Sequence, residues 1–114
     1  METELLKLLL PSDLVDQFEL IRIEQMADGA HLFLDQRNLP PQEYDGHKLE
    51  SKGFLDQVMI RDFPLRGKAC FLHLRRRKWH DHTTGKSVYS SWDSVAEGTR
   101  LTAEFAAFLK GFDR

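Results

Sequence analysis

The first part of the chain places apolar residues at the spacing of short helices. A helix is predicted over residues 4–9, because Thr3 is a suitable N-cap and Pro11 disfavours helical angles in the residue before it. Ser12 offers a second N-cap, and the apolar residues that follow it recur at helix-like intervals. The chain is therefore expected to open with two short helices.

From Phe18 onward, apolar and polar residues alternate with a period of two, which is typical of strands. Residues 18–26 and 30–36 are predicted to form a β-hairpin around the turn signal Met-Ala-Asp-Gly at positions 26–29. Residues 37–53 contain two prolines and two glycines and are expected to be mostly loop. A loop of this length is long for a compact domain and is often functional.

A second hairpin is predicted further along the chain. The strand around residues 58–63 turns at Pro64–Gly67 and returns as a long strand from Lys68 to about Trp79. Residues 87–92 are a predicted third strand of this sheet. One face of the long strand is apolar and carries Cys70, Leu72 and Leu74.

The last segment, residues 99–113, is predicted to form an amphipathic helix with Thr102 as its N-cap candidate. Its apolar stripe is more typical of a core contact than of a ligand site. With 114 residues, the chain has room for a single domain. The predicted fold class is α+β, with short helices at the start, two antiparallel hairpins and a helix at the end.

Charge is distributed unevenly, although the formal net charge is only −2. Residues 1–46 hold three basic and ten acidic side chains, whereas residues 47–86 hold ten basic and four acidic ones. Within the one domain we therefore distinguish an acidic helix–hairpin segment, residues 1–46, from a basic hairpin segment, residues 47–92. A local positive surface can bind a polyanion despite the negative net charge. The alternative is an ordinary solvated basic face.

Few residues favour catalysis or metal binding. Cys70 lies on an apolar strand face, where a thiol is usually inert, and the chain has no serine-nucleophile elbow or glycine-rich phosphate loop. His80-Asp81-His82 is the nearest approach to a metal site, with Cys70 as a further donor, but the paired spacing of structural zinc ligands is absent. We therefore predict no catalytic residues, no metal and no cofactor.

The strongest local feature is the basic run Arg75-Arg76-Arg77-Lys78, followed by Trp79. In a strand, Arg75 and Arg77 point one way while Arg76 and Lys78 point the other. Because the preceding face is apolar, this part of the strand is expected to project into solvent as an arm that contacts phosphates, with an aromatic ring nearby. The alternative is an edge strand that positive charge protects from aggregation.

The residues also resemble a known family. The turn Asp-Phe-Pro-Leu-Arg-Gly-Lys at positions 62–68, the Arg-Arg-Arg arm and the Arg-Leu-Thr helix start at positions 100–102 occur in this order in the N-terminal region of bacterial insertion-sequence transposases. Ser-Lys-Gly-Phe at positions 51–54 and the Leu-Pro-Pro stretch at positions 39–41 are similar to a subgroup that encodes this region as a short separate reading frame.

The resemblance implies recognition of the terminal inverted repeats of a mobile element, together with a separately encoded DDE-type catalytic subunit. Related transposases often carry a zinc ribbon here. In this chain His80 falls near one expected cysteine position, and the other expected positions hold no cysteine. We therefore expect a degenerate ribbon held by its own apolar core. Because no catalytic domain follows residue 112, the chain is not expected to be an enzyme by itself.

The predicted DNA-binding residues follow from the basic run and its neighbours, and no membrane partner is expected. They are Arg75, Arg76, Arg77, Lys78, Trp79, Arg61, Arg66, Lys68, Lys52 and Arg100. A non-catalytic adaptor, whose acidic half docks a basic partner, remains an alternative, as does an inactive remnant. The single cysteine favours a cytoplasmic protein, and the composition leaves the oligomeric state open.

Overall fold

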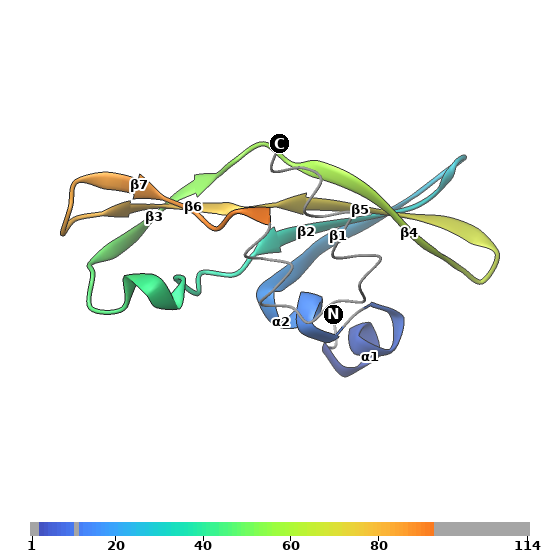
Figure 1. Ribbon diagram of the computed structural model, residues 1–114. Coiled ribbons are helices and arrows are strands. Elements are labelled where there is room, and N and C mark those ends of the chain that lie inside the picture. The colour runs from blue at the N-terminus through green and yellow to red at the C-terminus, as the bar shows by residue number, and fades with distance from the viewer. Residues whose placement is uncertain (1–2, 11, 93–114) are drawn as a thin grey trace.

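The computed structural model describes residues 3–10 and 12–92. Two small β-sheets lie side by side along the long axis of a molecule of 49 × 27 × 25 Å (Figure 1). The chain is thus a mixed α+β protein, as its hydrophobic pattern predicts. The helix predicted over residues 99–113, and Arg100 within it, lie outside the described residues.

Both predicted N-terminal helices are present. Helix α1 covers Thr3–Leu9 and helix α2 covers Ser12–Gln17, and the two lie against one face of the larger sheet (Figure 1). Their apolar side chains, Leu6, Leu10, Leu14 and Val15, are buried. Among the described residues, neither helix approaches the length or apolar character needed to span a bilayer.

The larger sheet is built from the two predicted hairpins. Strands β1 (Phe18–Met26) and β2 (Gly29–Gln36) form the first hairpin, and β4 (Val58–Leu65) and β5 (Lys68–Arg75) form the second. The sheet order is β1-β2-β5-β4, because β2 pairs with β5 in parallel. The acidic and basic segments therefore share one sheet and are not separate structural units.

The β2–β5 junction depends on a glycine. Gly29 begins β2 at φ 142°, and a Cβ atom at this position would collide with the backbone carbonyl of Ala69 on β5. Since only glycine tolerates both conditions, the turn residue Gly29 also allows the two hairpins to approach each other.

The smaller sheet contains β3 (Leu49–Phe54), β6 (Arg77–Asp81) and β7 (Lys86–Val88), in the order β3-β6-β7. The expectation of a loop over residues 37–53 is wrong at its end, where β3 begins, and a 3₁₀ turn covers Gln42–Tyr44. The strand predicted over residues 87–92 is confined to β7. Sequence pattern missed β3 because its partner strand, β6, is distant in sequence.

The long predicted strand is present as β5 and β6, which are divided only at Arg76. The chain runs directly from β5 of one sheet into β6 of the other. At the break between them, the Arg76 carbonyl oxygen accepts a hydrogen bond of 2.9 Å from the backbone N–H of Leu55, just after β3. The expected solvent-projecting arm is therefore wrong: beyond Leu74 the strand becomes the centre of the three-stranded sheet, with β3 and β7 on either side.

The main core lies between the helices and one face of the four-stranded sheet. Cys70, Leu72 and Leu74 on β5 are fully buried, as predicted, and they pack with Leu32 and Leu34 of β2. Burial raises the pKa of the Cys70 thiol to about 11, with a smaller contribution from Asp62. Cys70 is therefore an apolar packing residue and not a reactive thiol.

Candidate nucleic-acid interface

The side chains of the basic run alternate between two sides of the strand, as predicted. The guanidinium groups of Arg75 and Arg77 both lie over the ring of Phe54, at 4.2 Å and 4.7 Å from its centroid. Arg76 lies on the other side, 4.7 Å from the ring centroid of Trp92 and 5.5 Å from that of Tyr89.

Arg75 and Arg77 connect parts of the fold. Arg75 donates two hydrogen bonds of 2.6 Å to the carboxylate of Asp35, and this contact raises the pKa of Arg75 against the opposing effect of burial. Arg77 donates to the Gln36 carbonyl oxygen at 3.1 Å and to the Ser51 hydroxyl at 2.6 Å. Both side chains thus hold β2 and β3 against the central strand.

Arg76 also contacts its own fold. Its Nη1 donates to the Ser90 carbonyl oxygen at 3.1 Å, and its guanidinium lies between the aromatic side chains that follow β7. The three arginines are only partly exposed, so the structure assigns them mainly to the junction between the sheets.

Trp79 is not the exposed aromatic that the sequence predicts. Its side chain is 0% exposed, and its indole N–H donates to the Asn38 side-chain oxygen at 2.8 Å. A ring in this position cannot stack on a base or a sugar. The prediction failed because Asn38 comes from the loop after β2 and covers Trp79 only in the folded chain.

The open face of the three-stranded sheet carries the next residues of the same alternation. Lys78, His80 and His82 project from β6 and its turn on this side, across from Glu50 and Lys52 of β3. We call these five residues, together with Tyr89, the lysine–histidine face. Lys52, His82 and Tyr89 are exposed, and Lys78 and His80 are partly exposed.

A bulge in β3 brings the two lysines of this face together. Ser51 pairs with Trp79 and Phe54 pairs with Arg77, so that Lys52 and Gly53 both oppose Lys78. Gly53 has φ 91°, which suits this irregularity. Two cationic side chains from different strands therefore leave the same side of the sheet at adjacent positions.

Glu50 is the acidic side chain among these residues. It accepts a hydrogen bond of 2.8 Å from His82 and lies 3.2 Å from the ammonium group of Lys52. Hydrogen bonds from His82 and then Lys52 lower the pKa of Glu50. Because these pairs are exposed, they are weak and a phosphate group can exchange with them.

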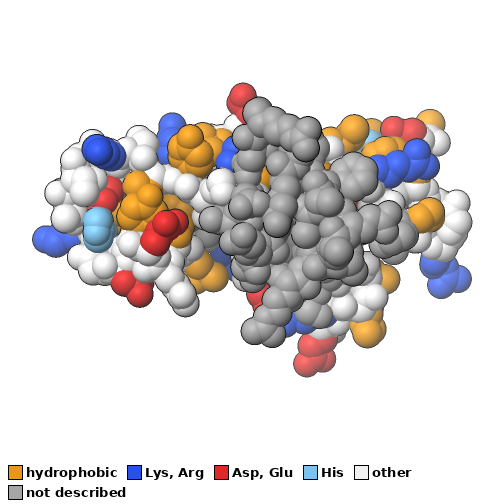
Figure 2. All heavy atoms as spheres, viewed as in Figure 1, with side chains coloured by type: hydrophobic (Ala, Val, Ile, Leu, Met, Phe, Trp, Pro, Cys, Tyr) orange, Lys and Arg blue, Asp and Glu red, His pale blue; other side chains and the backbone are white. Residues whose placement is uncertain are grey.

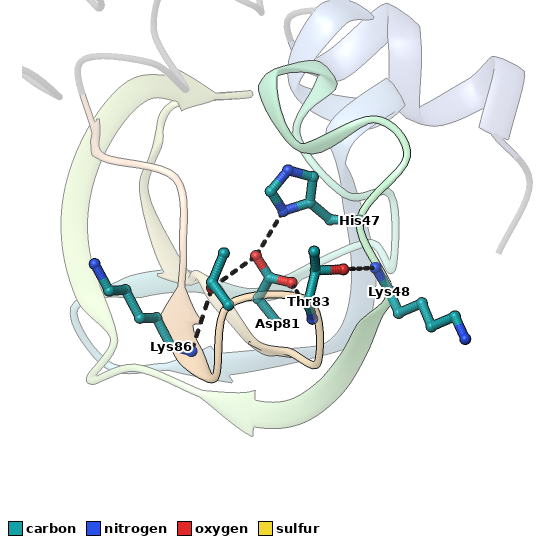
Figure 3. Close-up of polar contacts among 6 residues, drawn as sticks. His47, Lys48, Asp81, Thr83 and Lys86 are labelled. Carbon is teal, nitrogen blue, oxygen red and sulfur yellow. Dashed lines mark hydrogen bonds and ion pairs between the residues drawn. The ribbon is translucent and has the colours of Figure 1, made fainter.

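The opposite face of the same sheet is organised around a buried carboxylate. Asp81 accepts hydrogen bonds from His47 at 2.7 Å, from the Thr83 backbone at 2.9 Å and from the Thr84 hydroxyl at 3.0 Å (Figure 3). Burial alone would raise the pKa of Asp81, but these hydrogen bonds lower it to about 2. The network fixes the β6–β7 turn and the start of β3.

The sequence His80-Asp81-His82 is therefore split by the strand. The two imidazoles lie on the open face at 4.6 Å between ring centroids, whereas Asp81 points to the other side and Cys70 lies in the other sheet. Within residues 3–10 and 12–92, no group of three or more metal-ligating side chains is placed to hold an ion.

The remaining predicted cations lie elsewhere. Arg66 and Lys68 are exposed at the β4–β5 turn, a two-residue turn with positive φ at Arg66 and Gly67. Arg61 is also exposed and lies 5.7 Å from the ring centroid of Phe71. Figures 1 and 2 show the β4–β5 and β6–β7 turns at opposite ends, with basic side chains near both. The predicted residues are thus not brought into one site.

Sequence reasoning missed part of the lysine–histidine face. The sequence indicates His80 and His82 only as possible metal ligands or as a replacement for a ribbon cysteine, and it gives no role for Tyr89. The signal was the period of two, which continues beyond Lys78 and places every second side chain on the same face.

In comparisons with known proteins, no family model matches the chain, and neither a curated protein nor a solved structure matches it.

Proposed function

We propose that the protein is a DNA-binding module that contacts duplex phosphates through the lysine–histidine face. The observation that carries this proposal is the adjacent position of Lys52 and Lys78 on the open side of the three-stranded sheet. The other side of this sheet is held by the hydrogen bonds of Asp81. Lysine ammonium groups on a fixed sheet face suit phosphate contacts, which position a protein on DNA without reading its sequence.

The neighbouring groups support this role. His80 and His82 add hydrogen-bond donors next to the lysines, and the exposed ring of Tyr89 supplies a surface for sugar contacts. The arginine run supports the face indirectly, because Arg75 and Arg77 hold the strand in place from the opposite side. Within the lysine–histidine face, Glu50 is the acidic residue that opposes phosphate binding, and its contacts with Lys52 and His82 are exposed.

The resemblance to insertion-sequence transposases extends the proposal to a biological role. We propose that the module recognises the terminal repeats of a mobile element in the bacterial cytoplasm, with catalysis supplied by a separately encoded subunit. We also propose that the three-stranded sheet takes the place of the zinc ribbon, with the Asp81 network performing the task of the metal.

The experiment is fluorescence anisotropy across a salt titration, with one duplex carrying the element end and one scrambled duplex. The double variant Lys52→Ala/Lys78→Ala should weaken binding and flatten the slope of log K against log[salt] by about 2, because each phosphate contact contributes about 0.9. Both side chains are at the surface, so the variant should remain folded, as circular dichroism can verify.

The matched control is Arg66→Ala/Lys68→Ala, which removes the same charge from the far end of the molecule. Its salt slope should change by less than half as much. An unchanged slope in the lysine variant, or an equal effect in both variants, would contradict the proposed surface. Absence of binding to both duplexes at low salt would contradict DNA binding and favour the adaptor.

A further inference from the structure

The outer face of the four-stranded sheet, opposite the core, contains a polar hollow of about 250 Å³. A water molecule occupies about 30 Å³ in the liquid, so the hollow has room for several waters or for one tetrahedral anion. Its lining comes from β1, β2 and β5 and from the residue before β4. The groups that decide its chemistry are Arg22, Phe33, Asp35, Gln57, His73 and Arg75.

This lining contains two guanidinium groups and one carboxylate. Arg75 uses the Nε and Nη2 edge of its guanidinium for Asp35, so the edge that carries Nη1 faces away from that carboxylate. The guanidinium carbon of Arg22 lies over the ring of Phe33, 3.8 Å from its centroid. Its ion pair with Glu24 is exposed and therefore weak. The hollow itself thus has one excess positive charge.

A chain of hydrogen bonds sets the orientation of the uncharged donors. Gln57 Nε2 lies 3.2 Å from His73 Nδ1, His73 Nε2 lies 2.8 Å from His31 Nδ1, and His31 Nε2 lies 2.8 Å from Asp28 Oδ1. With Gln57 as the first donor, each imidazole accepts at Nδ1 and donates from Nε2, so every nitrogen in this chain has a suitable partner. Gln57 Nε2 keeps a second hydrogen for a ligand.

The effect of Arg22 on His73 agrees in sign with this charge count. The pKa of His73 is lowered, first by burial, then by His31 and Arg22, while Glu24 opposes the shift. Burial disfavours a charge of either sign, so only the smaller contribution of Arg22 favours an anion here. Phe33 also stacks on His73, with 4.2 Å between the ring centroids. This contact holds two side chains of the lining against each other.

We propose that this hollow binds a phosphate group, held between the guanidinium groups of Arg22 and Arg75 and the amide of Gln57. Planar guanidinium groups match the geometry of phosphate oxygens, and the rigid sheet holds the two arginines in place without a ligand. The hollow lies on the opposite side of the β5–β6 strand from Lys78. It is therefore independent of the proposed DNA surface.

Inorganic phosphate is the probe, titrated into the ¹⁵N-labelled full chain at constant ionic strength and pH 6.5. The Nε resonances of Arg22 and Arg75 and the side-chain amide of Gln57 should shift in a saturable manner. Arg22→Gln should weaken binding at least fivefold. Asp35→Asn should tighten it severalfold, because the variant removes the carboxylate that repels phosphate, and this second variant separates binding from simple surface charge.

The matched control is Arg61→Gln, which removes an exposed arginine from the same sheet face outside the hollow. Its phosphate affinity should remain within twofold of that of the parent chain. Shifts that grow linearly without saturation, or an Arg61→Gln variant that loses as much affinity as Arg22→Gln, would overturn the proposal.

A final arm identifies the source of the phosphate. When the titration is repeated with saturating duplex DNA, a proportional loss of phosphate affinity identifies a DNA phosphodiester as the occupant. An unchanged affinity identifies a free phosphate compound instead. Both results support the hollow as a phosphate site, and neither depends on the lysine–histidine face.

Discussion

The two sheets share one continuous strand but are held together by different forces. The four-stranded sheet buries leucines, Ile60 and Cys70 against two helices, in a core that also contains Trp92. The three-stranded sheet buries only Trp79 and Val88 as apolar side chains, and neither belongs to that core. Its geometry depends instead on Asp81, which accepts hydrogen bonds from the β6–β7 turn and from His47, just before β3. One sheet is held by apolar burial, and the other by directed polar contacts.

The largest expected effect is on the stability of the four-stranded sheet. Leu74 is fully buried between Leu34 and Val58, so Leu74→Ala should lower the free energy of unfolding by about 2–5 kcal/mol. Urea denaturation followed by circular dichroism measures this loss. The control is Met59→Ala on the opposite face of the same sheet, where the side chain is 53% exposed and the change should be within about 0.5 kcal/mol.

The hydrophobic pattern predicted this sheet better than the other one. Alternation over Cys70, Leu72 and Leu74 identified the buried face, and the Asp-Gly and Arg-Gly pairs marked both hairpin turns. The parallel pairing of β2 with β5 was not predictable, because no local signal specifies which strands of two hairpins become neighbours. It depends on a backbone contact between Gly29 and Ala69, 40 residues apart.

The candidate sites were predicted less completely, since their partners are distant in sequence. Alternation correctly separated Arg75 and Arg77 from Arg76 and Lys78. It could not show that Asp35 binds Arg75, because that carboxylate comes from another hairpin. An arginine run therefore indicates a phosphate-binding surface only when its guanidinium groups are not already paired with carboxylates of the same fold.

The second effect compares neighbours on the central strand. Arg77→Ala removes hydrogen bonds to Gln36 and Ser51 and should cost about 1–3 kcal/mol of stability, whereas Lys78→Ala should change stability by less than about 0.5 kcal/mol. When both variants are folded, Lys78→Ala should lower DNA affinity more than Arg77→Ala does. Chemical denaturation of the two variants tests the expected difference in stability, and fluorescence anisotropy tests the expected difference in DNA affinity. Equal stability of the two variants would contradict the structural role of Arg77.

The third effect depends on pH. An aspartate has a pKa of about 3.9 in an unfolded chain, whereas that of Asp81 is about 2 in the fold. Because the folded pKa is the lower one, Asp81 stabilises the fold above pH 4, and this contribution is lost as the pH falls towards 2. The denaturation midpoint of Asp81→Asn should therefore be lower at neutral pH and fall less steeply below pH 4. Parallel curves for parent and variant would exclude the effect.

The smallest expected effect is an absence of change at the two tryptophans. Trp79 and Trp92 are 0% and 1% exposed, so their emission should be resistant to a soluble quencher and should stay constant when DNA saturates the protein. Tyr89→Trp supplies the positive control, because it places an indole on the lysine–histidine face, where DNA should quench it. Quenching of the parent chain by DNA would mean that a buried tryptophan becomes accessible on binding; the sequence alone predicts Trp79 to be the contact residue. Quenching only in Tyr89→Trp would locate the DNA contact on the lysine–histidine face. Trp79 would then be a buried residue that packs on the opposite side of the same strand.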